Sequence, residues 1–97
     1  MRVVENMADV TVTLYSSNFC GACTSTRATL EQLAPLLGQR VAWREINVAV
    51  DPDEAETAGI TNTPTVVITG ADGVERMRAS GVPTSPQVLT AIAAALP

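Results

Sequence analysis

The stretch NFCGAC, residues 18–23, contains both cysteines of the chain, Cys20 and Cys23. It separates an apolar run from a long segment whose apolar residues recur at helical spacing. At a helix N-terminus, unpaired backbone N–H groups and the positive end of the helix dipole lower the pKa of a thiol. Cys20 is placed to become such a thiolate, and Cys23 follows about one helical turn later. The spacing predicts a redox centre in which Cys23 attacks a mixed disulfide formed at Cys20.

Two other interpretations fit the cysteine pair less well. A structural zinc site takes four ligands, whereas the chain has two cysteines and no histidine, so carboxylates or a second chain would have to complete the site. A structural disulfide between these cysteines would close a very short loop and would restrict the unfolded chain little. We therefore interpret the pair as redox-active and expect neither a metal nor an organic cofactor.

The length and composition indicate one small domain. Ninety-seven residues leave no room for a second core, so we assign residues 1–9 to a short N-terminal tail and residues 10–97 to the domain. Aromatic residues are only 3% of the chain, so small aliphatic side chains must fill the interior. This composition favours thin helix-on-sheet layers over a large ligand cavity. Whether translation starts at Met1 or at Met7 stays open.

The charge distribution argues against two classes of partner. The net charge is −4, and the cations are six arginines without any lysine, whereas phosphate binding relies on clustered cations. No stretch has the apolar length of a membrane span, and the first residues lack the apolar core of a secretory signal. We therefore expect a cytoplasmic protein with no nucleic-acid or membrane partner. We further expect a monomer.

The predicted elements follow the order strand, helix, strand, helix, strand, strand, helix. Periodicity predicts strands at residues 10–15, 41–48, 65–69 and 74–79, and helices at 21–37, at 51–59 and from residue 84 or 85 onward. We expect Asp51 to cap the second helix, which begins at Pro52, and Trp43 to lie in the core. The last helix is expected to bury one apolar face, formed by Val88, Leu89, Ile92, Ala95 and Leu96.

From residue 10 onward the chain resembles the thioredoxin and glutaredoxin superfamily, and within it a small glutaredoxin-like thioredoxin. The resemblance rests on the CxxC motif five residues after Tyr15, on the segment Asp51–Ile68 with its Thr63-Pro64 pair, on the Asp72-Gly73 hairpin and on Gly81 before the last helix. It implies a thioredoxin fold of order βαβαββα. Such a fold has a central four-stranded mixed sheet with helices on both faces.

The resemblance also implies which residues bind substrate. The bond before Pro64 is expected to be cis and to face the cysteines, so that the backbone of Thr63 pairs with an extended substrate segment. The Thr63 hydroxyl could donate to the Cys20 thiolate and lower its pKa. We expect Phe19 to belong to an apolar collar around Cys20 rather than to the core. The implied substrate-binding residues are Phe19, Gly21, Ala22, Thr63, Pro64 and Gly81.

The chain also departs from both branches of the superfamily. Thioredoxins usually carry a buried aspartate in the first strand, where this chain has Leu14, so a proton acceptor for Cys23 is missing unless Glu45 supplies one through water. Glutaredoxins usually carry Gly-Gly and Asp after the hairpin, together with cations that hold glutathione. Residues 79–83 here read ASGVP, which does not support glutathione binding.

We therefore predict a thiol-disulfide oxidoreductase that reduces or exchanges disulfides of protein substrates. A thioredoxin-reductase-like flavoenzyme is expected to reduce it in turn. Gly21 and Ala22 add no charge beside the thiolate, so the expected potential is about −200 to −270 mV. The alternatives are a glutathione-coupled glutaredoxin-like enzyme, a non-catalytic binding module with redox-switched cysteines, and a carrier of a metal or cluster bridged between two chains through Cys20.

Overall fold

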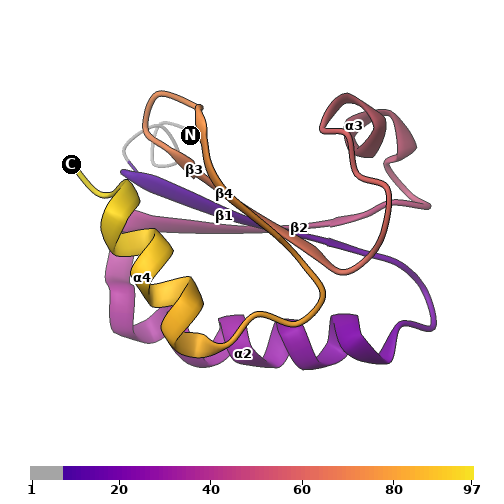
Figure 1. The fold of residues 1–97 in the computed structure, drawn as a ribbon, viewed down its shortest axis with the longest axis horizontal. Coiled ribbons are helices and arrows are strands. Elements are labelled where there is room, and N and C mark those ends of the chain that lie inside the picture. Colours follow the sequence, from indigo (N-terminus) through magenta and orange to yellow (C-terminus); the bar gives the residue numbers. More distant parts are fainter. Residues whose placement is uncertain (1–7) are drawn as a thin grey trace.

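The computed structural model describes residues 8–97, and its centre is one four-stranded sheet. The strands are β1 (Val10–Ser16), β2 (Val41–Asn47), β3 (Thr65–Gly70) and β4 (Glu75–Ser80). They lie in the order β2-β1-β3-β4, with β2 parallel to β1 and with β3 antiparallel to both β1 and β4. The predicted fold, a thioredoxin fold with a mixed sheet, is confirmed (Figure 1).

The helices cover the two faces of the sheet unequally. Helices α2 (Gly21–Leu37) and α4 (Ser85–Ala95) lie on one face, and the short α3 (Pro52–Thr57) lies on the other (Figure 1). The larger core is enclosed between the sheet and the two long helices, and it is built from aliphatic side chains such as Leu14, Ile68 and Ile92. A smaller cluster of Tyr15, Ile46 and Val67 packs under the α3 segment.

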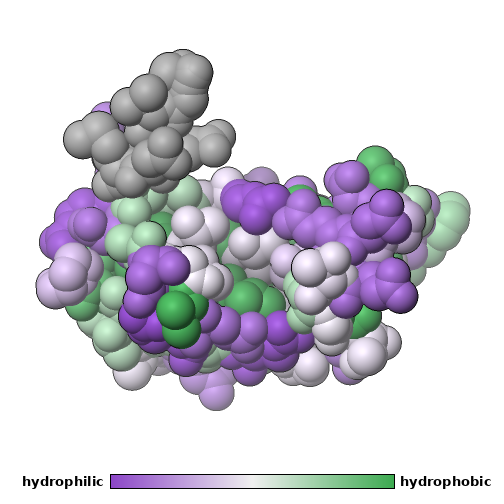
Figure 2. Space-filling model, turned by 90° about the horizontal axis from the view of Figure 1, so that it is seen from above, coloured by the Kyte–Doolittle hydropathy of each residue, from purple (hydrophilic) through white to green (hydrophobic). Residues whose placement is uncertain are grey.

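Because α3 has only six residues, it covers only part of its face of the sheet, and no other helix among residues 8–97 lies on this face (Figure 1). A shallow hollow on this face is lined by side chains of the first three strands, among them Thr11, Thr13 and Thr69. Figure 2 looks onto this side and shows hydrophilic surface interspersed with apolar residues. Threonines suit this position because their β-branched side chains favour a strand and their hydroxyls tolerate water.

Every strand differs from its predicted range by one residue at one end or at both: β1 and β3 extend one residue further, to Ser16 and Gly70, and β4 ends at Ser80. At the end of β2 and the start of β4, turns take up the residue beside the strand. β2 ends at Asn47 rather than at residue 48, since the carbonyl of Asn47 accepts the N–H groups of Val50 and Asp51 in a tight turn. β4 begins at Glu75 rather than at residue 74. Val74 closes the hairpin, where its carbonyl accepts the N–H of Gly70 and its own N–H donates to Asp72 Oδ1.

The prediction that the Asp51 side chain caps α3 is wrong. Asp51 is the N-cap residue by position, but its carboxylate accepts no hydrogen bond from the helix. Instead, Glu54 in the first turn binds Arg44 of β2, with 2.7 Å between Oε2 and Nη2, and this ion pair joins the helix to the sheet. At α4 the cap is Thr84, which exchanges side-chain and backbone hydrogen bonds with Gln87 in a capping box.

The core differs from the prediction at three positions. Leu89 keeps 37% of its surface exposed, whereas Val88 and Ile92 on the same helix are buried. Residues 88, 92 and 95 recur every turn on one face, and residue 89 is rotated by about 100° from residue 88. Trp43 is only partly buried and packs against the edge of the larger core. The buried Thr26 was not expected there, and its hydroxyl donates to the Ala22 carbonyl.

The predicted N-terminal tail and both candidate starts fall mainly on residues 1–7, outside the described residues. Asp9, the last residue of that tail, is fixed to Arg40. Its N–H donates to the Arg40 carbonyl, and its carboxylate accepts from Arg40 Nε, each at 2.8 Å. Within residues 8–97, no helix combines the length and the apolarity that a membrane crossing requires.

A candidate dithiol site at the N-terminus of α2

The sulfur of Cys20 lies at the N-terminus of α2. Cys20 is the N-cap residue of this helix and has an extended backbone, with φ −115° and ψ 100°. Its Sγ accepts the backbone N–H of Cys23 at 3.0 Å, and Cys20 and Cys23 form a disulfide with 5.2 Å between their Cα atoms. After reduction the same N–H group and the helix dipole would stabilise negative charge on Cys20. The geometry therefore agrees with the predicted nucleophile.

The two sulfurs differ in their access to solvent. Cys23 is 1% exposed, whereas Cys20 is only half-buried, and Gly21 and Ala22 between them are exposed. Phe19 is fully exposed and adopts a left-handed backbone conformation, with φ 56°, so it is not part of the core. An incoming disulfide therefore reaches Cys20 and not Cys23, which is the asymmetry that a nucleophile and a resolving cysteine require.

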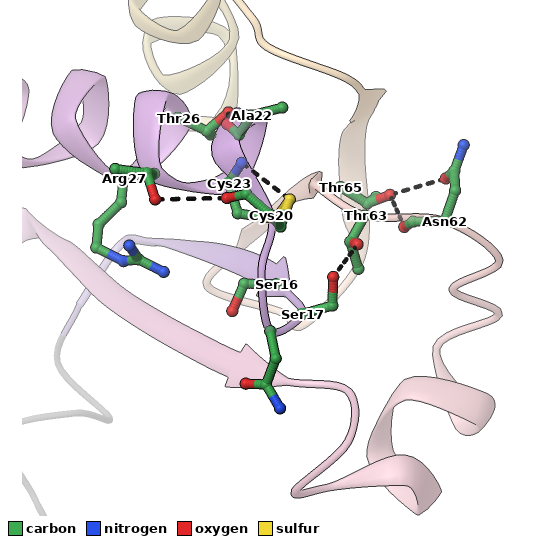
Figure 3. The surroundings of a disulfide bond; sticks show 12 residues. Ser16, Ser17, Cys20, Ala22, Cys23, Thr26, Arg27, Asn62, Thr63 and Thr65 are labelled. Carbon is green, nitrogen blue, oxygen red and sulfur yellow. Dashed lines mark hydrogen bonds between the residues drawn. A yellow bond between two sulfur atoms is a disulfide. The ribbon is translucent and has the colours of Figure 1, made fainter.

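A second loop lies beside the disulfide and carries Thr63 and Pro64. The bond between them is cis, as expected, and Pro64 is buried. The Thr63 and Ser17 hydroxyls are 2.7 Å apart and hydrogen-bonded, and Figure 3 shows both residues around the disulfide. In this disulfide form the Thr63 hydroxyl is thus bonded to Ser17 rather than to Cys20.

A third loop, after β4, completes the site. The N–H of Gly81 donates to the Pro64 carbonyl at 2.9 Å. Gly81 has a φ of 88°, a backbone conformation that glycine adopts without steric cost. The structure thus brings together the cysteines and the predicted positions on the other two loops.

The sequence analysis did not single out two residues that fix these loops. Ser17 joins the first loop to Thr63 across 46 residues of chain, and no local pattern indicates such a bond. Asn62 Oδ1 accepts from the hydroxyls of Thr65 and Ser80. Asparagine beside a proline turn is itself a signal, because its side chain often bonds nearby groups in turns.

Arg78 of β4 fixes the segment that leads from α3 to Thr63. Its guanidinium donates to the carbonyls of Ala58 and Gly59 at 2.7 and 3.3 Å, and it also binds Glu75. These carbonyls lie at the C-terminal end of α3, where the helix dipole favours a cation. Arg78 therefore holds the segment that precedes the Thr63-Pro64 loop against the edge strand β4.

Glu45 is occupied by other groups and is poorly suited to accept a proton from Cys23. Arg27 Nε donates to its Oε1 at 2.7 Å, while Arg27 Nη2 and the Ser16 hydroxyl bind its Oε2 at 2.6 and 2.8 Å. The hydrogen bonds from Arg27 lower the pKa of Glu45, with a further contribution from Ser16, against the opposing effect of burial. Glu45 pairs with Leu14 across the β1-β2 ladder, so it lies beside the position at which thioredoxins usually carry the buried aspartate.

The lowered pKa of Glu45 makes its contribution to stability dependent on pH. A carboxylate whose pKa is lower in the folded protein stabilises the fold above its unfolded pKa of about 4.3, and this contribution is lost as pH falls through the folded value. We expect Glu45→Gln to lower the free energy of unfolding at pH 7 by less than about 1 kcal/mol, since both partners are more than a third exposed.

Urea unfolding of the wild type and Glu45→Gln at pH 7, 5, 4 and 3 tests this prediction. The difference in the free energy of unfolding between the wild type and Glu45→Gln should shrink below about pH 4.3. The other acids titrate in both proteins and cancel in the comparison. A difference that stays constant down to pH 3 would show that the ion pair does not cause it.

A disulfide with one accessible and one buried sulfur, placed at a helix N-terminus beside a cis-proline loop, defines the class of dithiol proteins built on the thioredoxin fold. Among residues 8–97, no group of three or more His, Cys, Asp or Glu side chains could hold a metal ion. A family model described as Thioredoxin matches residues 1–94, and the chain belongs to the thioredoxin family. It is a thiol-disulfide oxidoreductase.

Similar proteins agree with this assignment. A thioredoxin from Methanocaldococcus jannaschii is 33% identical over 86 residues, which cover 89% of this chain and 95% of that protein. A thioredoxin from Rhodospirillum rubrum is 33% identical over 52 residues, 54% of this chain and 50% of that protein. Two solved structures share the fold. A mutant thioredoxin from Halobacterium salinarum has a TM-score of 0.84 at 22% identity, covering 98% of this chain and 81% of its own. Chloroplastic thioredoxin z has a TM-score of 0.82 at 23% identity, covering 95% and 82%.

Proposed function

We propose that this protein reduces disulfides in protein substrates, with Cys20 as the nucleophile and Cys23 as the resolving cysteine. The observation that carries the assignment is the position of the Cys20 sulfur as the N-cap of α2, half-buried and bonded to the Cys23 N–H. The buried Cys23 supports its role as the second attacking group, because it reaches Cys20 but not solvent.

The reaction transfers two electrons from the dithiol to the substrate. The Cys20 thiolate attacks one sulfur of the substrate disulfide, which forms a mixed disulfide and releases the other substrate sulfur as a thiolate that takes a proton from water. Cys23 then loses its proton and attacks the Cys20 sulfur. This step forms the Cys20-Cys23 disulfide and releases the second substrate thiol.

The substrate segment is proposed to lie between the helix N-terminus and the two opposite loops. Backbone groups of Thr63 would pair with an extended chain, in the manner of strand addition. The first turn of α2 and the loop after β4 would form the two sides of this substrate-binding site. The proposed contact residues are Phe19, Gly21, Ala22, Thr63, Pro64 and Gly81.

The wider context is also proposed. A thioredoxin-reductase-like flavoenzyme would return the disulfide to the dithiol, which would place the protein in cellular electron transport and redox homeostasis. We propose that it acts as a monomer in the cytoplasm, without a nucleic-acid or membrane partner. The family assignment supports a disulfide substrate and a reductase in general terms.

A redox titration in glutathione buffers tests the proposed function. Free thiols are trapped with an alkylating agent, and the intact mass is read at each ratio of reduced to oxidised glutathione. We expect a direct passage from two thiols to an internal disulfide at about −200 to −270 mV. A persistent glutathione adduct would instead support the glutaredoxin-like alternative. If the cysteines oxidise reversibly in this titration but the protein does not reduce a protein disulfide in a turnover assay, the result would support the alternative of a non-catalytic binding module.

A further inference from the structure

The three chain segments that build the site contain no charged residue. Residues 10–26, 57–71 and 79–97 include no Asp, Glu, Lys, Arg or His, although the whole chain carries sixteen acidic and basic residues. Each of the three site loops lies inside one of these segments. The neutrality of the site is therefore a property of long stretches of sequence and not of a single loop.

The structure joins the loops into one neutral surface, which we call the active-site rim: residues 17–22, 61–64 and 80–82. The Ser17-Thr63 bond joins the first two loops, and the Gly81-Pro64 bond joins the second and third. The rim presents exposed apolar side chains at Phe19 and Val82, which are 108% and 51% exposed. Thr61 and Asn62 add uncharged polar side chains.

The two arginines directly adjoining these segments, Arg27 after residue 26 and Arg78 before residue 79, already bind other groups. Arg27 binds Glu45 through two hydrogen bonds of 2.6 and 2.7 Å. Arg78 binds Glu75 and the carbonyls at the end of α3. Neither guanidinium can turn to an anionic substrate without losing these bonds, and the net charge of −4 attracts no anion at long range.

We propose that the rim selects disulfides in uncharged polypeptide segments and disfavours charged segments of either sign, including glutathione disulfide. This inference rests on the proposed function. A charged side chain brought against the rim loses hydration and finds no opposite charge, whereas apolar and hydroxyl-bearing side chains meet matching groups. Each half of glutathione disulfide carries two carboxylates and one ammonium group, and the rim supplies a charged partner to none of them.

The test uses three peptides with the same disulfide ring, whose flanking residues are threonine and valine, aspartate, or arginine. The reduced protein is mixed in a single turnover with each peptide and, separately, with glutathione disulfide, and the released thiols are measured over time. We expect the neutral peptide to react about five- to tenfold faster than either charged peptide. Its rate should change less than about twofold between about 20 and 500 mM salt, because no charge steers the encounter.

Two variants that each add one lysine test whether the preference among the peptides arises at the active-site rim. Thr61→Lys places a cation on the rim, and Val74→Lys places one on the exposed hairpin at the other end of β3. Thr61→Lys should accelerate the aspartate peptide and slow the arginine peptide several-fold at low salt, whereas Val74→Lys should leave the order of the three peptides unchanged.

Each outcome separates the inference from the proposed function. If the neutral peptide is not reduced at all, the proposed function itself fails. If all peptides are reduced at equal rates, if a charged peptide is preferred, or if glutathione disulfide reacts as fast as the neutral peptide, the inference is overturned and the proposed function stands. Equal shifts in Thr61→Lys and Val74→Lys would show that selection does not occur at the rim.

Discussion

Cys20→Ser should lose protein-disulfide reduction by on the order of 10³-fold or more, because a hydroxyl at this position is a far weaker nucleophile than a thiolate. The fold should be retained. Serine is a favourable N-cap residue, and its hydroxyl can accept the N–H that Cys23 now donates to the Cys20 sulfur. Turnover of a fluorescent protein disulfide with an excess chemical reductant, together with circular dichroism, measures both effects.

Cys23→Ser is the matched variant, since it removes the other sulfur of the same pair. It should still attack the substrate through Cys20 but should then accumulate a mixed disulfide, visible as an added mass in non-reducing conditions. Thiols from the reductant would resolve this adduct slowly, so steady turnover should fall while the first attack is kept. Equal behaviour of the two variants, or trapping by Cys20→Ser instead of Cys23→Ser, would contradict the assigned roles.

The difference between the two cysteines follows from where the helix begins. Cys20 is the N-cap residue and Cys23 lies one turn inside α2, so the helix geometry aims the second residue toward the core and leaves the first at the entrance. Residues 21 and 22 between them face solvent. The CxxC spacing is thus what gives one sulfur access to substrate and the other access only to its partner.

Local sequence signals predicted most of the fold because the strands and helices here have clear periodicity. The β-branched run at residues 10–15, the hydroxyl residues at 84 and 85 before the last helix and the Asp72-Gly73 turn each specify structure through neighbouring residues. The cis Thr63-Pro64 bond and the convergence of Gly81 on Pro64 followed from the resemblance to a known family. No local pattern would have predicted either of them.

The remaining features depend on partners distant in the sequence. The Ser17-Thr63 bond spans 46 residues, and the Arg27-Glu45 pair joins α2 to β2, so neither can be read from a local window. The same holds for Glu54 in the first turn of α3, which binds Arg44 of a strand. Charged side chains on a small α/β domain have several possible partners, and only the packed structure selects one.

The apolar face of α4 gives the second large expected effect, on stability. Ile92 is 1% exposed and packs in the larger core against the sheet. Ile92→Ala should therefore lower the free energy of unfolding by about 2 to 5 kcal/mol, through lost burial and the cavity that remains. Urea unfolding of the oxidised protein measures the loss, with an unchanged dependence on urea if the unfolded state is unaffected.

Leu89→Ala is the matched control on the same helix, and it distinguishes the observed packing from the periodic pattern. The sequence pattern alone placed Leu89 and Ile92 on one buried face, whereas Leu89 keeps 37% of its surface exposed. Its replacement should cost less than about 1 kcal/mol, as is usual for side chains away from the core. Equal losses in the two variants would mean that α4 is rotated toward Leu89. If α4 buries one residue per turn and leaves Leu89 in contact with water, only Ile92→Ala should cause a large loss of unfolding free energy.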